Sequence, residues 1–186
     1  MNTRTRVLTG TALAIALGAG TFGAVSASAT PAPESAPAAA AAKKKDDGDD
    51  KNFTTTTHLT IDAATRAAQA TLKAAQSENQ KVTVAVVDRN GNTIVTLRGD
   101  GAGPQSYESA QRKAFTAVSW NAPTSVLAGR LAQAPNLKDI PGTLFLGGGV
   151  PVQANGAPVA GIGVAGAPSG DLDEKFAKAG ADSLSK

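Results

Sequence analysis

The chain of 186 residues contains no cysteine, one histidine and one methionine, the initiator Met1. The absence of cysteine excludes disulfides, thiolate-held iron–sulfur clusters and cysteine-based zinc sites. A single histidine also excludes a metal cage built from several imidazoles. Aromatic residues make up only 4% of the chain, whereas 20 glycines and 10 prolines indicate many turns. Neither a Gly-x-y nor a heptad period is sustained, which excludes collagen and coiled coil.

Clustered charge of one sign is also missing. The formal net charge is +3, but the 18 Lys and Arg include Arg4 and Arg6 close to the N-terminus. Residues 30–186 therefore hold 16 basic against 15 acidic residues. A protein that binds the phosphate backbone needs clustered cations, and this sequence has no such cluster. We expect no nucleic-acid partner.

The N-terminus has the pattern of a secretory signal peptide. Met1–Arg6 is short and basic, Val7–Gly20 is apolar, and Ala27–Ala29 reads as an A-x-A cleavage site. The alternative is a membrane anchor, but an apolar stretch this short cannot span a bilayer that needs about 20 residues. The sequence thus predicts a signal peptide over residues 1–29, no membrane insertion, and a secreted or cell-wall-associated protein. The export route stays open, because the two arginines are not adjacent.

Residues 30–52 are of low complexity, with prolines and a run of alanines followed by lysines and aspartates. Such a segment cannot bury apolar surface and is expected to be a solvated tether. A cation site on the four aspartates is the alternative, against which the neighbouring lysines argue. The folded domain is then expected over residues 53–186, which is long enough for one core.

Within the domain, hydrophobic periodicity and turn residues predict four helices and five strands. The first helix would bury Ile61, Ala64, Ala68, Leu72 and Ala75, and the second Ala110, Ala114, Ala117 and Val118. Asn-Gly pairs at Asn90-Gly91 and Asn155-Gly156 predict two hairpins. The expected helices cover residues 61–77, 106–119, 123–131 and 171–184, and the expected strands cover 82–87, 93–97, 143–146, 150–154 and 158–164. The order α-β-β-α-α-β-β-β-α predicts an α+β fold with a five-stranded, mostly antiparallel sheet.

Three motifs suggest familiar chemistry but lack its context. Gly161–Gly166 matches G-x-G-x-x-G, yet a dinucleotide site needs this loop after the first strand of a parallel βαβ unit. A glycine-rich strand approached closely by another backbone is the favoured interpretation. Gly147–Gly149 could cradle an anion, but no P-loop Lys-Ser/Thr follows it. A Ser-His-Asp hydrolase would have to use His58, and no G-x-S-x-G elbow is present.

A few polar side chains remain as candidates. His58 adjoins the tether, where a solvated side chain is the simplest interpretation. Glu108, Gln111 and Lys113 share one part of the second predicted helix, where they would form an exposed polar face. Glu108 and Arg112 are spaced to form an i,i+4 ion pair.

One set of short segments spans nearly all of residues 59–184: 82–92, 111–117, 147–152 and 160–167, followed by the acidic Asp173-Glu174. In this order the segments together resemble the GlcG/HbpS family of haem-degrading-type domains. The signal peptide, the charged tether and the stretch from Gly99 to Trp120 are most similar to the secreted, haem-binding branch of Streptomyces-type bacteria.

The resemblance implies a five-stranded antiparallel sheet with helices, assembly as a homo-octamer, and binding of haem b and of iron ions. It also implies that the protein modulates a membrane sensor histidine kinase of a two-component system under haem or redox stress. Thr143 occupies the position of the family's proposed axial haem ligand. The surface iron site of the family maps onto His58, Glu108, Gln111 and Lys113. Gln111 departs from the expected acid, and a neutral amide is a poorer ligand for ferric iron than a carboxylate.

The residue inventory limits how haem iron could be held. Without cysteine, and without methionine once the signal peptide is removed, the donors are His58, Tyr107 and weak oxygen ligands such as Thr143. A weakly held, exchangeable haem suits a sensor or scavenger, and Arg112 or Lys113 could pair with its propionates. The alternatives are an enzyme that degrades haem or removes its iron, and a small-molecule accessory module like the cytoplasmic GlcG relatives.

Overall fold

The computed structural model describes residues 52–185, so the predicted signal peptide and all of the predicted tether except Asn52 lie outside the described residues. In chain order the elements are α1 (Ile61–Ser77), β1 (Thr83–Asp88), β2 (Thr93–Arg98), α2 (Gln105–Trp120), α3 (Thr124–Gly129), β3 (Gly149–Ala154), β4 (Ala157–Ala165) and α4 (Gly170–Asp182), with short 3₁₀ turns at Arg130–Ala132, Pro135–Asp139 and Ser183–Ser185.

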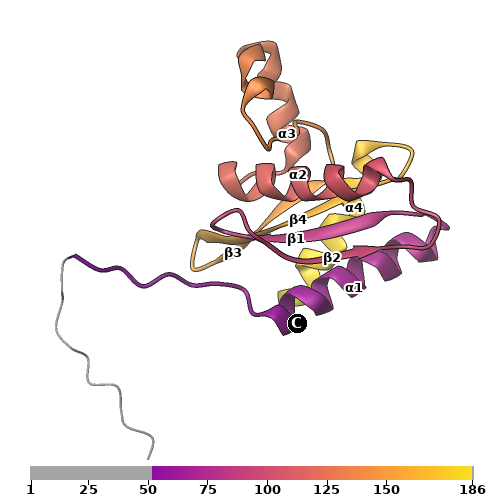
Figure 1. The fold of residues 1–186 in the computed structure, drawn as a ribbon, viewed down its shortest axis with the longest axis horizontal. Coiled ribbons are helices and arrows are strands. Elements are labelled where there is room, and N and C mark those ends of the chain that lie inside the picture. Colours follow the sequence, from indigo (N-terminus) through magenta and orange to yellow (C-terminus); the bar gives the residue numbers. More distant parts are fainter. Residues whose placement is uncertain (1–51, 186) are drawn as a thin grey trace, which may run out of the picture. The chain divides into compact units, whose positions relative to one another are not determined.

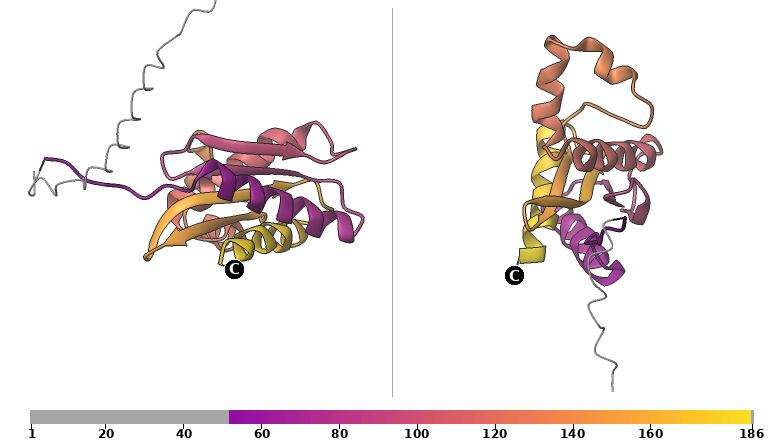
Figure 2. Two further views of the ribbon diagram at one scale, coloured as in Figure 1. Left: turned by 90° about the horizontal axis from the view of Figure 1, so that it is seen from below. Right: turned by 90° about the vertical axis from the view of Figure 1, so that its left-hand side faces the viewer.

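The strands form one antiparallel sheet of order β2-β1-β4-β3. Helix α2 packs on one face of this sheet, and α1 and α4 pack on the other (Figure 1). The right-hand view of Figure 2 shows the same three layers, with α3 and the turns that follow it projecting beyond α2. The predicted α+β class and the antiparallel arrangement are confirmed.

Alternate side chains of the buried strand β1 supply both faces of the sheet. Val84 and Val86 belong to the core shared with α1 and α4. Ala85 and Val87 instead contact the alanines of α2. This alternation is what a strand covered on both sides requires.

Thr60 precedes helix α1 as its N-cap, and its hydroxyl accepts a hydrogen bond from the N–H of Ala63 at 3.2 Å. The predicted buried alanines of this helix are buried. Ile61, which was also predicted to be buried, lies in the first turn of the helix and is 56% exposed. Ala67 and Thr71 complete the buried face in its place.

Glycines in β4 allow α2 to lie unusually close to the sheet. A Cβ added at Gly163 would stand 2.0 Å from the carbonyl oxygen of Ala110, and one at Gly161 would stand 2.2 Å from that of Ala114. The first two glycines of the G-x-G-x-x-G match therefore serve helix packing within an antiparallel strand. They do not open a nucleotide-binding loop.

The predicted fifth strand at residues 143–146 is wrong, and the described sheet has four strands. The backbone groups of this segment bond elsewhere, since the N–H of Thr143 reaches the carbonyl of Ile140 and the N–H of Leu144 reaches the hydroxyl of Thr116. Phe145 packs its ring edge against Trp120, with 5.3 Å between centroids. The segment is thus a loop beside the end of α2, in which Thr143 and Phe145 are buried and Leu146 is exposed.

Candidate functional site

A buried ion pair joins α2 to α4. The ammonium of Lys113 lies 2.8 Å from a carboxylate oxygen of Asp173 and donates to the carbonyl of Val164 at 3.0 Å. Both side chains are almost fully buried, at 6% and 4% exposure. The expected place of Lys113 on an exposed polar face is therefore wrong, because its side chain turns toward the sheet and α4.

Burial raises the pKa of the Asp173 carboxyl above its usual range. The Lys113 ammonium and the N–H of Ala167, which donates to the same carboxylate at 3.0 Å, act in the opposite direction. A carboxylate and an ammonium that are removed from water depend on one another for compensation. This pair therefore ties the two helices together at the C-terminal end of β4.

Glu174, the next residue of α4, organises the glycine loop before β3. Its carboxylate accepts the N–H of Gly148 at 3.2 Å, together with the N–H and the hydroxyl of Ser125 at 3.0 and 2.5 Å. The hydroxyl of Thr124 accepts the N–H of Gly149 at 2.8 Å. The loop Gly147–Gly149, which could have cradled an anion, is held by protein groups.

A cavity of about 460 Å³ adjoins these contacts and includes Lys113 and Asp173 among its lining. Within the part of the chain that the structure describes, no buried side-chain nitrogen or oxygen lacks a hydrogen-bond partner. The polar cluster beside the cavity is thus complete without a ligand. We interpret it as a structural connection between α2, α3 and α4.

The side of α2 that carries Gln111 and Arg112 is different. It is partly exposed to solvent and borders the β1–β2 hairpin. Gln111 donates to the hydroxyl of Thr96 on β2 at 3.4 Å. Arg112 forms the predicted ion pair with Glu108, and both side chains are largely exposed. A pocket of about 210 Å³, here called the α2–hairpin pocket, is lined by Val87, Gly91, Thr93, Gln111, Arg112, Phe115 and Gly142.

Phe115 forms one wall of the α2–hairpin pocket, between the hairpin turn and the segment that leads to Thr143. Its ring lies 2.8 Å from the position of a Cβ built on Gly91 and 3.6 Å from one built on Gly142. The sequence interpretation did not select Phe115 as a site residue. Its spacing of three from Arg112 and four from Gln111 could have shown that the three share a helix face.

Thr143 lies beside this pocket without lining it. Its hydroxyl donates to the carbonyl of Ile140 at 2.7 Å, and the residue is 6% exposed. The large apolar side chains on either side of it in sequence, Ile140 and Leu146, are 41% and 58% exposed. The segment around Thr143 therefore presents apolar surface that a single chain leaves uncovered.

His58 stands apart from the other predicted iron ligands. It is exposed on the extended segment before α1, where Nε2 lies 2.8 Å from the hydroxyl of Thr56. Its charge contributes to lowering the pKa of Asp88, the last residue of β1. Residues 52–185 contain no group of three or more His, Asp or Glu side chains arranged to hold a metal ion.

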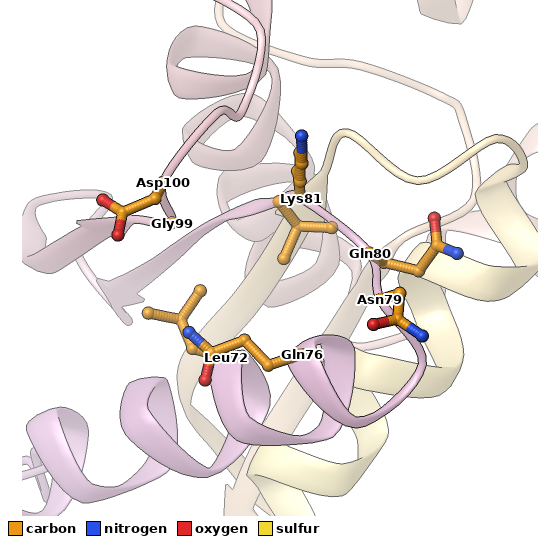
Figure 3. A pocket seen from close by; sticks show the side chains of 8 residues that line it. Leu72, Gln76, Asn79, Gln80, Lys81, Gly99 and Asp100 are labelled. Carbon is orange, nitrogen blue, oxygen red and sulfur yellow. The ribbon is translucent and has the colours of Figure 1, made fainter.

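A further pocket of about 280 Å³ lies at the other end of the sheet, between the end of α1 and the start of β1 (Figure 3). Leu72 and Gln76 of α1 form one side, and Lys81 and Asp100 stand on the loops opposite. None of the predicted site residues lines it. Of the helices in the described part of the chain, none is long and apolar enough to cross a membrane.

The predicted site residues therefore separate into three places. Gln111 and Arg112 meet in the α2–hairpin pocket beside Thr143, with Glu108 paired to Arg112. Lys113 is buried on the opposite side of α2 with Asp173. His58 belongs to the extended segment before α1.

Comparisons with known proteins give a matching family model and several similar proteins. A family model described as "Haem degrading protein HbpS-like" matches residues 59–182. The crystal structure of HbpS is 75% identical, with a TM-score of 0.71 over 72% of this chain and 95% of that one. The crystal structure of a PduOC:heme complex is 25% identical, with a TM-score of 0.62 over 68% of this chain and 94% of that one. An uncharacterised 15.0 kDa protein from the dhaT–dhaS intergenic region of Citrobacter freundii is 32% identical over 113 residues, which are 58% of this chain and 80% of that protein.

Proposed function

The chain belongs to the HbpS-like family of haem-degrading proteins, and from this premise we propose that it is a secreted haem-binding protein. It sequesters haem b and iron and modulates a membrane sensor histidine kinase of a two-component system under haem or redox stress. The family match and the similarity to a haem complex support the haem part of the proposal. The N-terminal signal pattern supports secretion.

The observation that carries the haem proposal is the α2–hairpin pocket. It combines an aromatic ring, Phe115, with an exposed guanidinium, Arg112, next to the segment that holds Thr143. These groups match the chemistry of haem, which has a flat apolar ring and anionic propionates. The volume of about 210 Å³ is below the range of roughly 300–1,000 Å³ typical of enclosing ligand pockets. Haem would therefore be only partly covered by one chain, and a second subunit of the proposed homo-octamer would complete the site.

Thr143 is the proposed axial ligand in this arrangement. Its hydroxyl hydrogen is used in the bond to the carbonyl of Ile140, so its oxygen keeps lone pairs for a metal. A neutral hydroxyl is a weak ligand, which fits a haem that is bound and released as a signal. The chain has no cysteine and therefore no thiol that could sense redox conditions. Bound haem would supply a redox-active iron for that purpose.

Of the two propionate candidates, the geometry favours Arg112. Its side chain is half-exposed, and its ion pair with Glu108 is weakened by competing water. The Lys113 ammonium is buried and committed to Asp173 and to a backbone carbonyl. Recruiting Lys113 to a propionate would leave Asp173 as an uncompensated buried charge.

The proposed iron site on the surface retains Glu108 as its only acidic member. Gln111 contributes an amide oxygen, a poorer donor to ferric iron than a carboxylate. Lys113 does not share the exposed face of Glu108, and His58 would have to join from the extended segment before α1. Iron capture at this place is therefore proposed to be weaker than a site with two carboxylates on α2 would allow.

A haemin titration followed by the Soret absorption tests the proposal. Wild type is expected to give a saturable band, and Arg112→Ala is expected to weaken binding about tenfold, as loss of one charge-assisted contact would. Arg66→Ala on α1 is the matched control, because it removes the same exposed charge on the opposite face of the sheet. Thr143→Val keeps the shape of the side chain but removes the hydroxyl, whereas Thr143→Ser keeps the hydroxyl. Only the valine variant should change the Soret spectrum of the haem complex.

The absence of a saturable band in folded wild type would reject haem binding and favour the small-molecule accessory module. The description of the family also keeps haem degradation as a second candidate. Adding a reductant and oxygen to the haem complex distinguishes it. Loss of the porphyrin absorption with release of iron would show turnover, whereas a stable band would support a sensor or scavenger.

A further inference from the structure

The outer edge of β2 is open and carries little protection against pairing. Among the described residues, β2 pairs only with β1, and its middle residues are half-buried. It contains neither proline nor lysine, the residues that commonly block an edge. Both edge strands have a register shift, β2 opposite Val86 and Val87 and β3 between Val152 and Gln153. The β3 edge differs in containing Pro151, which has no backbone N–H to donate, so β2 is the edge better suited to accept another strand.

The segment before α1 has the properties of an added strand. Residues Phe53–His58, here called the arm, are all exposed, and Phe53 is 81% exposed. No backbone group of residues 53–59 makes a hydrogen bond, and the one side-chain bond is between Thr56 and His58. Four consecutive threonines give the arm a strong β-propensity. Its six residues match the six of β2.

The arm cannot pair with the β2 of its own chain without reversing direction. The hydroxyl of Thr60 caps α1, so the arm leaves the domain at the N-terminal end of this helix. From there the arm runs away from the sheet (Figures 1 and 2). A strand that leaves the sheet at this end is placed to reach another molecule.

We propose that the arm of one copy of this chain pairs as an additional strand with the free edge of β2 in a second copy. Since each copy has both an arm and an open β2, the exchange can be reciprocal about a twofold axis. Main-chain hydrogen bonds would supply the affinity, as in other cases of strand addition. Phe53 at the tip of the arm would be covered by the partner. The pairing needs no haem, and its test does not depend on haem binding.

Disulfide mapping in the cysteine-free chain tests this pairing directly. Thr55→Cys protein is mixed with protein that carries one cysteine on β2, either Thr93→Cys or Thr96→Cys, and the mixture is oxidised gently. Opposite residues of paired antiparallel strands have Cα atoms about 4.5–5.5 Å apart, which is within the range that a disulfide spans. We expect heterodisulfides with β2 and few with Gln153→Cys, the control on the β3 edge. Equal yields at the two edges, or none at β2, would overturn the proposal.

A proline in the arm gives a second, independent test. Thr55→Pro removes a backbone N–H and should shift the assembly to smaller species in light scattering. Thr55→Val keeps the N–H and the β-propensity and should assemble like wild type. The helical signal in far-ultraviolet circular dichroism should be the same for all three proteins, because the arm makes no backbone contact with its own domain. An unchanged assembly of the Thr55→Pro protein would contradict the pairing.

Discussion

The two sides of α2 lie one residue apart in sequence and behave in opposite ways. Toward β4 and α4, Lys113 is buried with fixed partners, and glycines bring the helix backbone against the strand. Toward the β1–β2 hairpin, Arg112 is exposed, β2 is an open edge, and a shallow pocket separates helix from turn. The first side holds the fold together, whereas the second offers groups to a ligand.

This difference separates residues that determine stability from residues available for binding. A buried charge cannot leave its partner without a large penalty, so Lys113 and Asp173 suit a structural role. An exposed guanidinium exchanges partners at little cost. The proposed haem face therefore lies on the side of α2 where substitutions should change affinity more than stability.

The largest expected effect comes from breaking the buried pair. Lys113→Ala leaves the Asp173 carboxylate without its ammonium, which should lower the free energy of unfolding by about 3–5 kcal/mol. Arg112→Ala on the open side should cost no more than about 1 kcal/mol. Urea unfolding followed by circular dichroism measures both variants. The double variant Lys113→Met/Asp173→Leu should recover much of the loss, and a loss as large as that of Lys113→Ala would contradict the electrostatic explanation.

The next effect tests the close approach of α2 to β4. Gly163→Ala would place a methyl group 2.0 Å from the carbonyl oxygen of Ala110, a backbone atom that cannot move alone. We expect a loss of about 3 kcal/mol, at the upper end of overpacking effects. Gly129→Ala is the control, because α3 leaves open space there, and it should be neutral or stabilising by up to about 1 kcal/mol. In thermal unfolding, the melting temperature should fall for Gly163→Ala and should stay the same or rise for Gly129→Ala.

A smaller loss is expected where Glu174 holds the glycine loop. Glu174→Ala removes the acceptor for Ser125 and for the N–H of Gly148, which should cost about 2 kcal/mol, in the range for hydrogen bonds to charged groups. Hydrogen exchange should increase at residues 124–148 and stay unchanged in the β1–β2 hairpin. A uniform increase over the domain would show that the effect is not confined to this loop.

The sequence predicted those parts of the fold that depend on local pattern. The Asn-Gly turns gave both hairpins, and in β3–β4 the two turn residues, Asn155 and Gly156, have positive φ as such a turn requires. The alanine stripe of α2 was also correct, since a helix face of small residues implies close packing. The segment 143–146 was not predictable in this way. A short apolar run fits a strand or a buried loop equally well, and only the neighbouring Thr116 and Trp120 decide between them.

The candidate site was less predictable than the fold for the same reason. Charge and spacing on α2 indicated Glu108, Arg112 and Lys113, but spacing does not say which partner a lysine will meet. Asp173 lies 60 residues from Lys113 and shares no motif with it. Position relative to the sheet, known only from the fold, separates the buried lysine from the exposed arginine.

The smallest predicted effect concerns Asp88 at the tip of the open hairpin. Burial would raise the pKa of its carboxyl, but hydrogen bonds from the N–H groups of Asn92 and Asn90, at 2.9 and 2.8 Å, and the charge of His58 lower it below the usual value. In the unfolded chain this pKa is about 3.9, so the unfolded state binds more protons in the interval below it. The carboxylate therefore contributes its full stabilisation above about pH 4 and loses it as the pH falls through the pKa of the folded state.

Asp88→Asn should be slightly less stable than wild type at neutral pH, and urea unfolding should show this difference shrinking in acid. If the difference in stability does not depend on pH, Asp88 acts through the geometry of the turn rather than through its charge. A carbon NMR titration of its carboxyl would measure the pKa directly.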